Sequence, residues 1–572
     1  MMLFLIFDII IIYLFSQSIA SGKWSFMPRK RGYLFYNFLS VLLVYYFFGI
    51  FIIYHHIIIL ITILLFYVLS LTMYYVHEFR GTNISLSDVL SLNTAKEVAG
   101  GYEYKIKPIF VIGLIVVIEE CIRRIMIIRQ MMALYDSGSL YARSMPHDIV
   151  LSLRINFVPL VLFLIILFLL YRKINMSKYD YSLSAGENEG YIYNFFSSIP
   201  IFHAKKNSED ILSIDAEVRD LIENAGAIDK IEVDKKSLPH VIVVMNESFG
   251  SVHYAVDTDV EVTPYYDSLQ GLTKGNLYVN TFGGGTANTE FEFLTSMTIG
   301  NYDFPVMPYN NFVKRDKYSL ARYFKSLDYK TIAMHPYTAT NYHRDLVYKR
   351  FGFDELLFFN DFREKKYIRD FVSDESFYEE IIRRYKENVM DGKKLFLFGI
   401  TMQNHSGYSH FDGEMVKSKI AGEKESIDSY LSLIKISDDA LKTLMDYFEK
   451  EDERVVILFF GDHNASFGTV QNKLLYGEST DYEFTNAYKV PFFIYDNKSS
   501  DDDYIDSISA NFLSIELLKK ANLPYDKLHD FLSKIYDEYP TYNYHKRKNR
   551  NTKKESYIPY DLYMQYEKEY LR

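Results

Sequence analysis

The sequence predicts a protein of two parts, an α-helical membrane anchor followed by an α/β domain with a mainly parallel central sheet and helices on both faces. Long apolar runs dominate the chain up to about residue 173, whereas the remainder is charged and polar. In the second part, short β-branched apolar runs alternate with stretches of helical periodicity, which is typical of a parallel sheet covered by helices. With 572 residues, the chain is long enough for both parts.

The anchor is expected to cross the membrane about five times, with four or six crossings as alternatives. The first apolar run has no basic segment before it and is long, which favours a membrane helix over a signal peptide. Charged residues fall inside two of the runs, Asp8 in the first and Glu119, Glu120, Arg123 and Arg124 in the third, which is the fourth crossing. We expect them to pair within the bundle or to lie at the interface. The apolar runs are residues 1–20, 33–75 (two crossings), 108–128 and 150–171.

Charge does not determine which way the anchor is oriented. The loop after the first span and the loop before the last span are both rich in Lys and Arg, and each would favour the cytoplasm. With five spans these loops lie on opposite sides, so the two indications contradict each other. Residues 81–104 are expected to form a short amphipathic helix on the membrane surface.

Four segments follow from these patterns. Residues 1–174 are the transmembrane domain, and residues 175–238 are a connector with amphipathic helices such as 211–225. Residues 239–530 are the α/β domain, and residues 531–572 are a C-terminal tail.

The composition excludes several functions. A net charge of −10 argues against a nucleic-acid partner, which requires a basic face. Cys121 is the one cysteine in the sequence, so the chain forms no internal disulfide and no cysteine-based metal site.

Short apolar runs predict five strands of the α/β domain. They are residues 240–245, 331–334, 395–400, 455–460 and 491–495, and helices are expected at 318–327, 377–388 and 427–448. Ligand sites of such sheets form at the carboxyl ends of the strands, so the residues that follow each run are the candidates for a site.

Polar residues follow four of these runs. They are Glu247 after the first, His335 after the second, His405 after the third, and Asp462 with His463 after the fourth. Each has an ordinary explanation as a helix cap or a solvated loop residue. Two carboxylates with an imidazole nevertheless suit a divalent ion, Mn²⁺ first, with Zn²⁺ or Mg²⁺ as alternatives.

Thr286 follows three consecutive glycines and precedes a stretch of helical spacing. Glycines permit close approach of another group, and a helix that starts here directs its positive end at whatever lies above Thr286. We expect Thr286 to cap this helix and to present a hydroxyl to an anion.

Five stretches of the second part resemble one known family. The chain is similar to the lipoteichoic acid synthase and phosphoglycerol transferase family, membrane-anchored members of the alkaline phosphatase/sulfatase superfamily. The similar stretches, in order, are VIVVMNESF, GGGTANTEFEFLTS, HRDLVYKRFGFDE, TMQNHSGY and FFGDHNASFG.

The resemblance implies roles for particular residues. It makes Thr286 the nucleophile, and it makes Arg344 and His405 ligands of the substrate phosphate. Two positions depart from the family, because Tyr337 and Tyr342 stand where glycerophosphate synthases carry an acidic residue and a tryptophan. They leave the identity of the head group open. The implied metal ligands are Glu247, Thr286, Asp462 and His463.

The resemblance also implies a reaction. An outward-facing domain on a multi-pass anchor in the cell membrane would transfer phosphoglycerol from phosphatidylglycerol to a glycolipid, a teichoic acid or a polysaccharide, through a covalent phospho-threonine. The alternatives are transfer of phosphoethanolamine or another lipid head group, or a catalytically silent protein that binds a polymer. The sequence lacks the Cys-x-Pro-x-Arg motif of sulfatases, so hydrolysis of sulfate esters is not expected.

Overall fold

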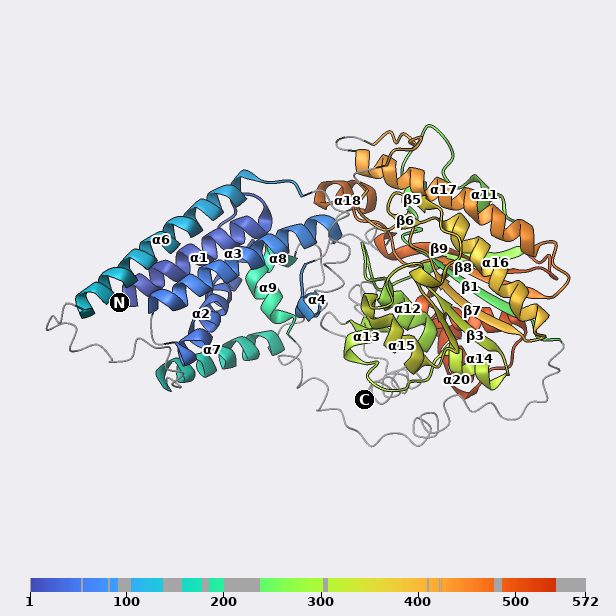
Figure 1. The fold of residues 1–572 in the computed structure, drawn as a ribbon, viewed down its shortest axis with the longest axis horizontal. Coiled ribbons are helices and arrows are strands. Elements are labelled where there is room, and N and C mark those ends of the chain that lie inside the picture. The colour runs from blue at the N-terminus through green and yellow to red at the C-terminus, as the bar shows by residue number, and fades with distance from the viewer. Residues whose placement is uncertain are drawn as a thin grey trace.

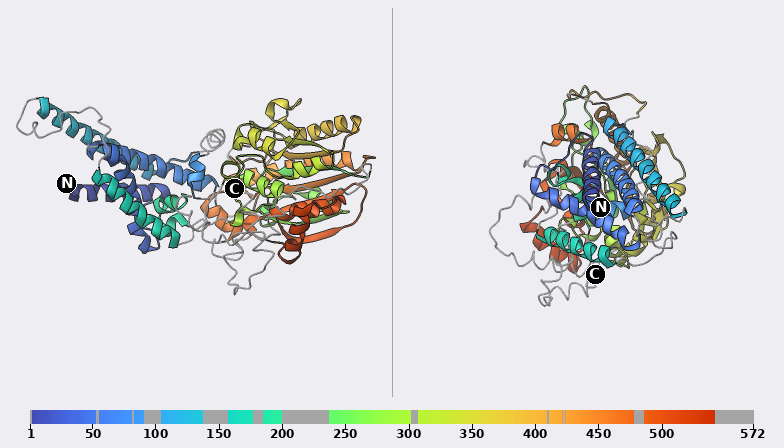
Figure 2. Two further views of the ribbon diagram at one scale, coloured as in Figure 1. Left: turned by 90° about the horizontal axis from the view of Figure 1, so that it is seen from below. Right: turned by 90° about the vertical axis from the view of Figure 1, so that its left-hand side faces the viewer.

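The computed structural model has an elongated shape, with a bundle of helices at one end and an α/β domain at the other (Figures 1 and 2). The N-terminus lies at the end of the bundle remote from the α/β domain. The structure describes residues 2–52, 55–80, 83–90, 104–136, 157–176, 185–199, 237–301, 307–408, 411–420, 422, 424–477 and 486–541.

Long helices occupy all five places where the sequence predicts a span. They are α1 (Met2–Ser21), α2 (Leu34–Phe51), α3 (His55–Arg80), α6 (Pro108–Asp136) and α7 (Phe157–Met176), with a short helix η1 (Arg31–Tyr33) before α2. Helix α1 packs on α3, α2 on α7, and α3 on α6. Three short helices accompany them, α4 (Leu86–Leu90), α8 (Ala185–Glu189) and α9 (Tyr191–Ser197).

Among the described residues, two helices are long and apolar enough to cross a membrane. They are Arg31–Phe51 and His55–Phe79, with mean hydropathies of 1.9 and 2.5. The apolar helix Leu5–Ser21 is shorter. Crossing is therefore supported for two helices rather than five, and the count of five remains a prediction.

The charged residues inside the predicted spans pair with one another. Arg124 is buried, and its Nη2 donates to Asp8 Oδ1 at 2.5 Å, while its Nε donates to Glu120 at 3.2 Å. Arg123 also binds Glu120. The expectation that these charges pair within the bundle is confirmed for Asp8, Glu120, Arg123 and Arg124, and it follows from the high cost of an unpaired charge in apolar surroundings.

The basic loop after α1 binds acidic residues of α8. Lys23 and Arg29 both pair with Glu187, at 2.8 and 2.6 Å, and Lys30 pairs with Glu189. Helix α9 is buried against α2 and α1. This part of the predicted connector therefore packs on the anchor, whereas residues 211–225 and most of the predicted tail lie outside the described residues.

The α/β domain is built on an eight-stranded sheet of order β10-β2-β9-β8-β1-β7-β3-β4. Strand β1 lies in the middle and pairs in parallel with both β7 and β8. The strands are β1 (His240–Asn246), β2 (Leu272–Tyr278), β3 (Lys330–Met334), β4 (Glu355–Leu357), β7 (Leu395–Ile400), β8 (Val455–Gly461), β9 (Lys489–Asp496) and β10 (Asp503–Ser509), and β5 (Tyr367–Ile368) pairs with β6 (Phe371–Val372) as a separate hairpin.

The five predicted strands are confirmed, and three others were not predicted. Strand β9 runs antiparallel to β2 and β8, so its carboxyl end lies at the edge of the sheet opposite the ends of β1, β7 and β8. Strands β2 and β10 carry polar residues such as Lys274 and Asp503, and β4 has three residues, so none of them forms an apolar run.

Helices cover both faces of the sheet, as predicted (Figure 1). They are α11 (Pro264–Ser268), α12 (Thr286–Thr295), α13 (Pro308–Asn311), α14 (Leu320–Ser326), α15 (Arg344–Phe351), α16 (Asp374–Met390), α17 (Glu425–Phe448), α18 (Thr469–Tyr476), α19 (Leu513–Ala521) and α20 (Lys527–Glu538). Short 3-10 helices are η5 (Val252–Tyr254), η6 (Ile299–Asn301), η7 (Asn341–His343), η8 (Phe359–Asp361) and η10 (Ala510–Phe512).

Alternate residues of β1 enter two separate hydrophobic cores. Val241 and Val243 join the core that contains α12, α14 and α19, whereas Ile242 and Val244 join the core that contains α16 and α17. A strand that is buried on both faces has no polar side. This explains why the sequence of β1 contains an uninterrupted apolar run. In the first core, Phe293 of α12 packs between Phe398 and Phe460, with ring centroids 5.8 and 5.3 Å away.

We expect Phe293→Ala to lower the free energy of unfolding of the α/β domain by about 3–5 kcal/mol, because it leaves a cavity between α12 and the sheet. Thermal unfolding of the purified protein measures this change. Tyr367→Ala, which removes an aromatic ring that is 50% exposed, is the matched control and should change stability little. Equal destabilisation by both variants would contradict the assignment of Phe293 to the core.

Candidate active site

The three glycines before α12 all adopt backbone conformations that other residues resist. Their φ angles are +66° at Gly283, +144° at Gly284 and +87° at Gly285. The Gly283 amide donates to the carbonyl of Asn464 at 3.0 Å, and Thr289 donates to the carbonyl of Asp462 at 2.8 Å. The start of α12 is therefore tied to the loop that follows β8.

Thr286 is the first helical residue of α12, and Gly285 is the N-cap. The expectation that Thr286 caps the helix is wrong, because the left-handed Gly285 lets the chain enter the helix one residue earlier. The Thr286 side chain instead turns away from the backbone of its own helix. Its hydroxyl donates to Glu247 Oε2 at 3.2 Å.

The register of the sheet explains why Glu247 and Asp462 meet. Asn246 of β1 pairs with Gly461 of β8, so the next residue of each strand lies at the same level. Oxygens of Glu247 and Asp462 and a ring nitrogen of His463 lie within 4.8 Å of one another, and all three residues are buried. His463 Nε2 is 3.2 Å from Asp462 Oδ2 and 3.7 Å from Glu247 Oε1.

These three residues fit a divalent cation. Asp462 Oδ1 accepts the amides of Ser248 and His463, but Asp462 Oδ2 is buried and accepts no hydrogen bond within the described part of the chain. Burial and the neighbouring charge of Glu247 raise the pKa of Asp462 well above its usual value. Two buried carboxylates with an open acceptor are what a cation would stabilise.

A buried polar network supports the cluster from behind. Asn246 donates to Asp374 Oδ2 at 2.8 Å, and Asn404 donates to Asn246 Oδ1 at 3.0 Å. Ser437 of α17 donates to the same oxygen of Asp374. Burial raises the pKa of Asp374 to about 6. The network joins the ends of β1 and β7 to α16 and α17, so it fixes the backbone that carries Glu247.

Arg344 forms a buried ion pair with Glu290, one turn along α12 from Thr286. Both side chains are at most 1% exposed. Arg344 donates from Nε and Nη2 to Glu290, and from Nη1 to Asn341 Oδ1 at 2.9 Å. Tyr309 and Tyr348 donate to Glu290 Oε2 at 2.8 and 2.6 Å. The pKa of Arg344 is raised by Glu290 despite its burial, so the guanidinium stays charged.

His405 lies on the loop that follows β7, and Arg369 holds this loop. The guanidinium of Arg369 donates to the carbonyls of Gln403, His405 and Gly407 at 2.9, 2.7 and 3.0 Å. Burial lowers the pKa of His405, while the charge of Glu247 opposes this shift. The imidazole is therefore neutral near pH 7 and lies within electrostatic reach of the Glu247 cluster.

Tyr337 and Tyr342 lie on either side of the remaining site residues. The Tyr342 ring is 5.0 Å from the guanidinium of Arg344. The Tyr337 ring is 6.3 Å from the ring of Phe371, and the Phe371 ring is 5.4 Å from the ring of His405. Both tyrosines are half-buried. The residues predicted from the sequence thus gather at one edge of the sheet, in two groups joined by α12.

Two residues of this region were not predicted. Glu290 had only a weak signal, because it is one of two acidic residues, with Glu292, in the helix that follows the glycines. No signal in the sequence pointed to Arg369, because it lies in the turn between the two-residue strands β5 and β6, with φ of +53°. Its distance in sequence from His405 gave no hint of the contact.

Comparison with known proteins identifies the family. The sulfatase family model matches residues 239–532, which is more than half of the chain. The chain belongs to the sulfatase family. The resemblance noted in the sequence and the α/β fold are thereby confirmed at the level of this family.

Individual sulfatase-family relatives are more distant. A protein of Rhizobium meliloti, named for cyclic beta-1,2-glucan modification, is 31% identical over 334 residues, which are 55% of this chain and 52% of that protein. The lipoteichoic acid synthase of Staphylococcus aureus is 23% identical over 248 residues, 41% of this chain and 37% of that protein. The chain spans about half the length, or less, of such curated relatives.

Solved structures share the fold of the α/β domain, and one of them is a phosphoglycerol transferase. The phosphoglycerol transferase GacH of Streptococcus pyogenes, in complex with sn-glycerol-1-phosphate, has a TM-score of 0.50 and 19% identity, and it covers 64% of this chain and 90% of that one. An identity this low supports similarity of fold alone.

We expect Glu290→Gln to lower the free energy of unfolding by about 3–5 kcal/mol, because it leaves the buried charge of Arg344 without its partner. Glu379→Gln is the matched control, because Glu379 pairs with Lys366 at the surface, where solvent screens the pair, and the change should alter stability little. Chemical denaturation of both variants measures the difference. Equal effects would show that the buried pair does not hold α12 in place.

Proposed function

We propose that the protein is a membrane-anchored transferase that moves a phosphoglycerol head group from phosphatidylglycerol to a cell-surface glycolipid, teichoic acid or polysaccharide. The observation that carries the proposal is the 3.2 Å hydrogen bond between the Thr286 hydroxyl and Glu247, within the cluster of Glu247, Asp462 and His463. Membership of the sulfatase family supports the same class of chemistry. A silent polymer-binding protein has no need for this arrangement.

A divalent cation held by Glu247, Asp462 and His463, with Thr286 as a fourth ligand, would stabilise the deprotonated threonine oxygen. Mn²⁺ is the proposed ion, with Mg²⁺ and Zn²⁺ as alternatives. The role of the chain is to hold these side chains at the start of α12. The free N–H groups of the first turn lie beside the attacking oxygen, so they favour a phosphate bound there.

The reaction has two steps. Thr286 Oγ attacks the phosphorus of the donor, the bond between phosphorus and the diacylglycerol oxygen breaks, and diacylglycerol leaves with a proton. In the second step an acceptor hydroxyl attacks the phosphorus of the phospho-threonine, and Thr286 regains its proton. In the first step His405, which is neutral near pH 7, is proposed to accept the Thr286 proton at one ring nitrogen and to donate the proton of the other ring nitrogen to the leaving oxygen.

Arg344 is proposed to bind the phosphate while it keeps its ion pair with Glu290. A guanidinium carries five N–H donors, and the bonds to Glu290 and Asn341 use one donor on each nitrogen. The second donors of Nη1 and Nη2 would meet a phosphate oxygen. Tyr342, over the guanidinium, and Tyr337, near His405, are proposed to border the head group.

The anchor is proposed to cross the membrane five times, with the N-terminus in the cytoplasm and the α/β domain outside. The basic loop after α1 then lies outside the cell, although basic loops usually lie in the cytoplasm. Its pairing with Glu187 and Glu189 supports this orientation, because it offsets the positive charge of that loop. The basic end of α6 then lies in the cytoplasm, as the rule requires.

The names of two relatives suggest the acceptor. One Rhizobium meliloti protein is named for cyclic glucan modification, and another, 28% identical over 238 residues, for capsular polysaccharide biosynthesis. A glycan acceptor is therefore included in the proposal. The anchor keeps the domain near a donor that stays in the bilayer, which raises the effective concentration of that donor.

Thr286→Ala should reduce release of diacylglycerol from phosphatidylglycerol by about a thousandfold or more, because it removes the attacking oxygen. Thr286→Ser retains a hydroxyl and is the matched control, with part of the activity kept. The full-length protein in phosphatidylglycerol vesicles is assayed by lipid extraction. Undiminished release by the alanine variant would overturn the assignment of the nucleophile.

Intact-protein mass spectrometry after exposure to mixed phospholipids should show one added glycerophosphate on Thr286, and none in Thr286→Ala. An added phosphoethanolamine would instead establish the alternative head group. The mass distinguishes the two head groups, because the part of the donor that is transferred stays bound to Thr286 in the covalent intermediate.

Chelation should abolish diacylglycerol release, and Mn²⁺ should restore it better than Mg²⁺ or Zn²⁺, because a mixed set of oxygen and imidazole ligands suits Mn²⁺. His463→Ala should weaken Mn²⁺ binding measured by calorimetry. His253→Ala, which removes an imidazole outside the cluster, should bind Mn²⁺ like the wild type. Full activity in the chelated protein would contradict the metal-dependent reaction.

A further inference from the structure

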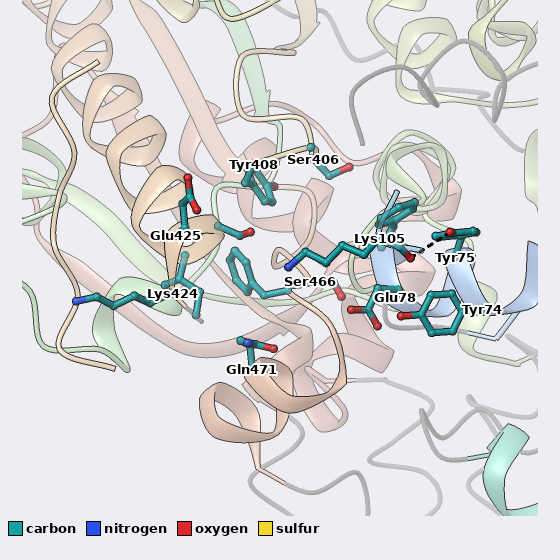
Figure 3. Close-up of a pocket in the computed structure, with 15 residues that line it drawn as sticks. Tyr74, Tyr75, Glu78, Lys105, Ser406, Tyr408, Lys424, Glu425, Ser466 and Gln471 are labelled. Atoms are coloured by element: carbon teal, nitrogen blue, oxygen red, sulfur yellow. Dashed lines mark hydrogen bonds between the residues drawn. The ribbon is translucent and has the colours of Figure 1, made fainter. Parts of the chain in front are cut away.

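A pocket of about 590 Å³ lies between the anchor and the α/β domain (Figure 3). One wall consists of the last turns of α3 and of Lys105, shortly before α6. The other wall consists of the loops after β7 and β8 and the starts of α17 and α18. Its volume falls within the range of small-molecule sites, about 300–1,000 Å³.

The anchor wall is aromatic. Tyr75 stacks on Phe79 with ring centroids 5.7 Å apart, and its hydroxyl donates to the carbonyl of Lys105 at 3.2 Å. Tyr74 packs on Phe110 at the start of α6. Tyr rings at the end of an apolar helix of spanning length are typical of the level at which lipid head groups meet the hydrocarbon. This wall would then lie near the depth of the glycerol backbone of a phospholipid.

The opposite wall belongs to the loops that carry the candidate active site. Ser406 directly follows His405, and Ser466 and Phe467 come from the stretch that begins with Asp462 and His463. This wall is therefore continuous in the chain with His405 and with the carboxylate cluster.

Aromatic side chains connect this wall to Glu247. The ring of Tyr408 lies 5.8 Å from the guanidinium of Arg369 and 5.3 Å from the ring of Tyr430. Tyr430 in turn donates to the carbonyl of Ser248 at 2.8 Å. One layer of aromatic side chains thus separates the pocket from the backbone beside Glu247.

The two walls approach each other closely at Gly468, the N-cap of α18. Its φ is +88°, a conformation that favours glycine, and a Cβ placed on it would lie 3.3 Å from Glu78 Oε1 of α3. A side chain here would require Glu78 to move, so glycine permits the close approach of the anchor to the loop from β8. The loop that carries Asp462 and His463 therefore ends beside the anchor.

The lining combines apolar faces with hydrogen-bond donors. The side chain of Lys105 extends across the pocket, and Ser466 and Gln471 are on the opposite wall (Figure 3). Ammonium, hydroxyl and amide donors suit the ester carbonyls of a diacylglycerol, and aromatic faces suit its first methylene groups. A sugar would also stack on aromatic rings, but the position at the end of an apolar helix favours a lipid.

We infer that this pocket binds the diacylglycerol portion of the donor phospholipid, with its ester groups between Lys105 and α18 and its acyl chains continuing along α3 into the bilayer. The inference rests on the proposed function, because it assigns a place to the leaving group of that reaction. It explains why residues of the anchor form one wall of a pocket whose other wall includes Ser406, the residue after His405.

Photo-crosslinking tests the location. Full-length Thr286→Ala in nanodiscs is exposed to phosphatidylglycerol with a diazirine next to the ester of one acyl chain. We expect crosslinks to peptides that contain Tyr75 and Phe79 and to the peptide of Ser466 and Phe467. Crosslinks confined to α6 and α7, away from the pocket, would overturn the inference. The inference would also be overturned if a glucan oligosaccharide prevented crosslinking in the pocket and unlabelled phosphatidylglycerol did not. The pocket would then bind the acceptor.

Kinetics test the contribution of Lys105. The ratio of phosphatidylglycerol turnover to that of a water-soluble phosphodiester should fall about tenfold in Lys105→Ala, because a hydrogen bond from a charged group is lost for the lipid alone. Lys107→Ala is the matched control, with the same change two residues away and outside the pocket lining, and should keep the wild-type ratio. An unchanged ratio in Lys105→Ala, or an equal fall in both variants, would overturn the subsite.

The two assays distinguish failure of the subsite from failure of the proposed function. If the wild-type protein turns over neither substrate, the proposed transferase activity fails, and the crosslinking pattern decides whether the pocket binds a lipid. If the soluble diester is turned over but the crosslinks miss the pocket, the activity stands and the subsite is overturned.

Discussion

Two carboxylates are buried side by side at the carboxyl ends of the adjacent strands β1 and β8, and much of the surrounding structure serves to hold them there. Glu247 and Asp462 meet because β1 and β8 are parallel neighbours in a register that pairs Asn246 with Gly461. Like charges in a buried place repel and are costly to desolvate. His463, the amides around Asp462 Oδ1 and the network behind Asn246 reduce that cost without removing it. The residual negative potential is the physical basis for expecting a cation.

Sequence reasoning recovered the parts of the fold that bury residues on both faces. Strands β1, β3, β7 and β8 each contain a buried apolar run, so they were predicted, together with the polar residues that follow them. Strands β2 and β10 were missed because Lys274 and Asp503 interrupt any apolar run near the edge of the sheet. The antiparallel direction of β9 depends on chain topology, which a local pattern does not contain.

Some residues of the candidate site could likewise be predicted from the sequence, and others could not. The residues at strand ends were predicted, and their gathering at one edge follows from the parallel sheet. The partner of Arg344 was not predicted, because Glu290 reaches it from another element and only three-dimensional packing reveals the pair. The capping role expected for Thr286 was wrong, because three glycines with positive φ move the start of α12 by one residue. Backbone conformations of this kind depend on surroundings that the sequence does not specify locally.

The close approach of Gly468 to Glu78 would link the membrane to the chemistry of the site. A Cβ on Gly468, at the end of the loop from β8, would lie 3.3 Å from Glu78 Oε1 of α3. A helix of spanning length changes its tilt when the hydrocarbon layer becomes thinner or thicker. Such a tilt of α3 would move Glu78 relative to the loop that carries Asp462 and His463. Bilayer thickness would then act on the geometry of this site from outside the α/β domain.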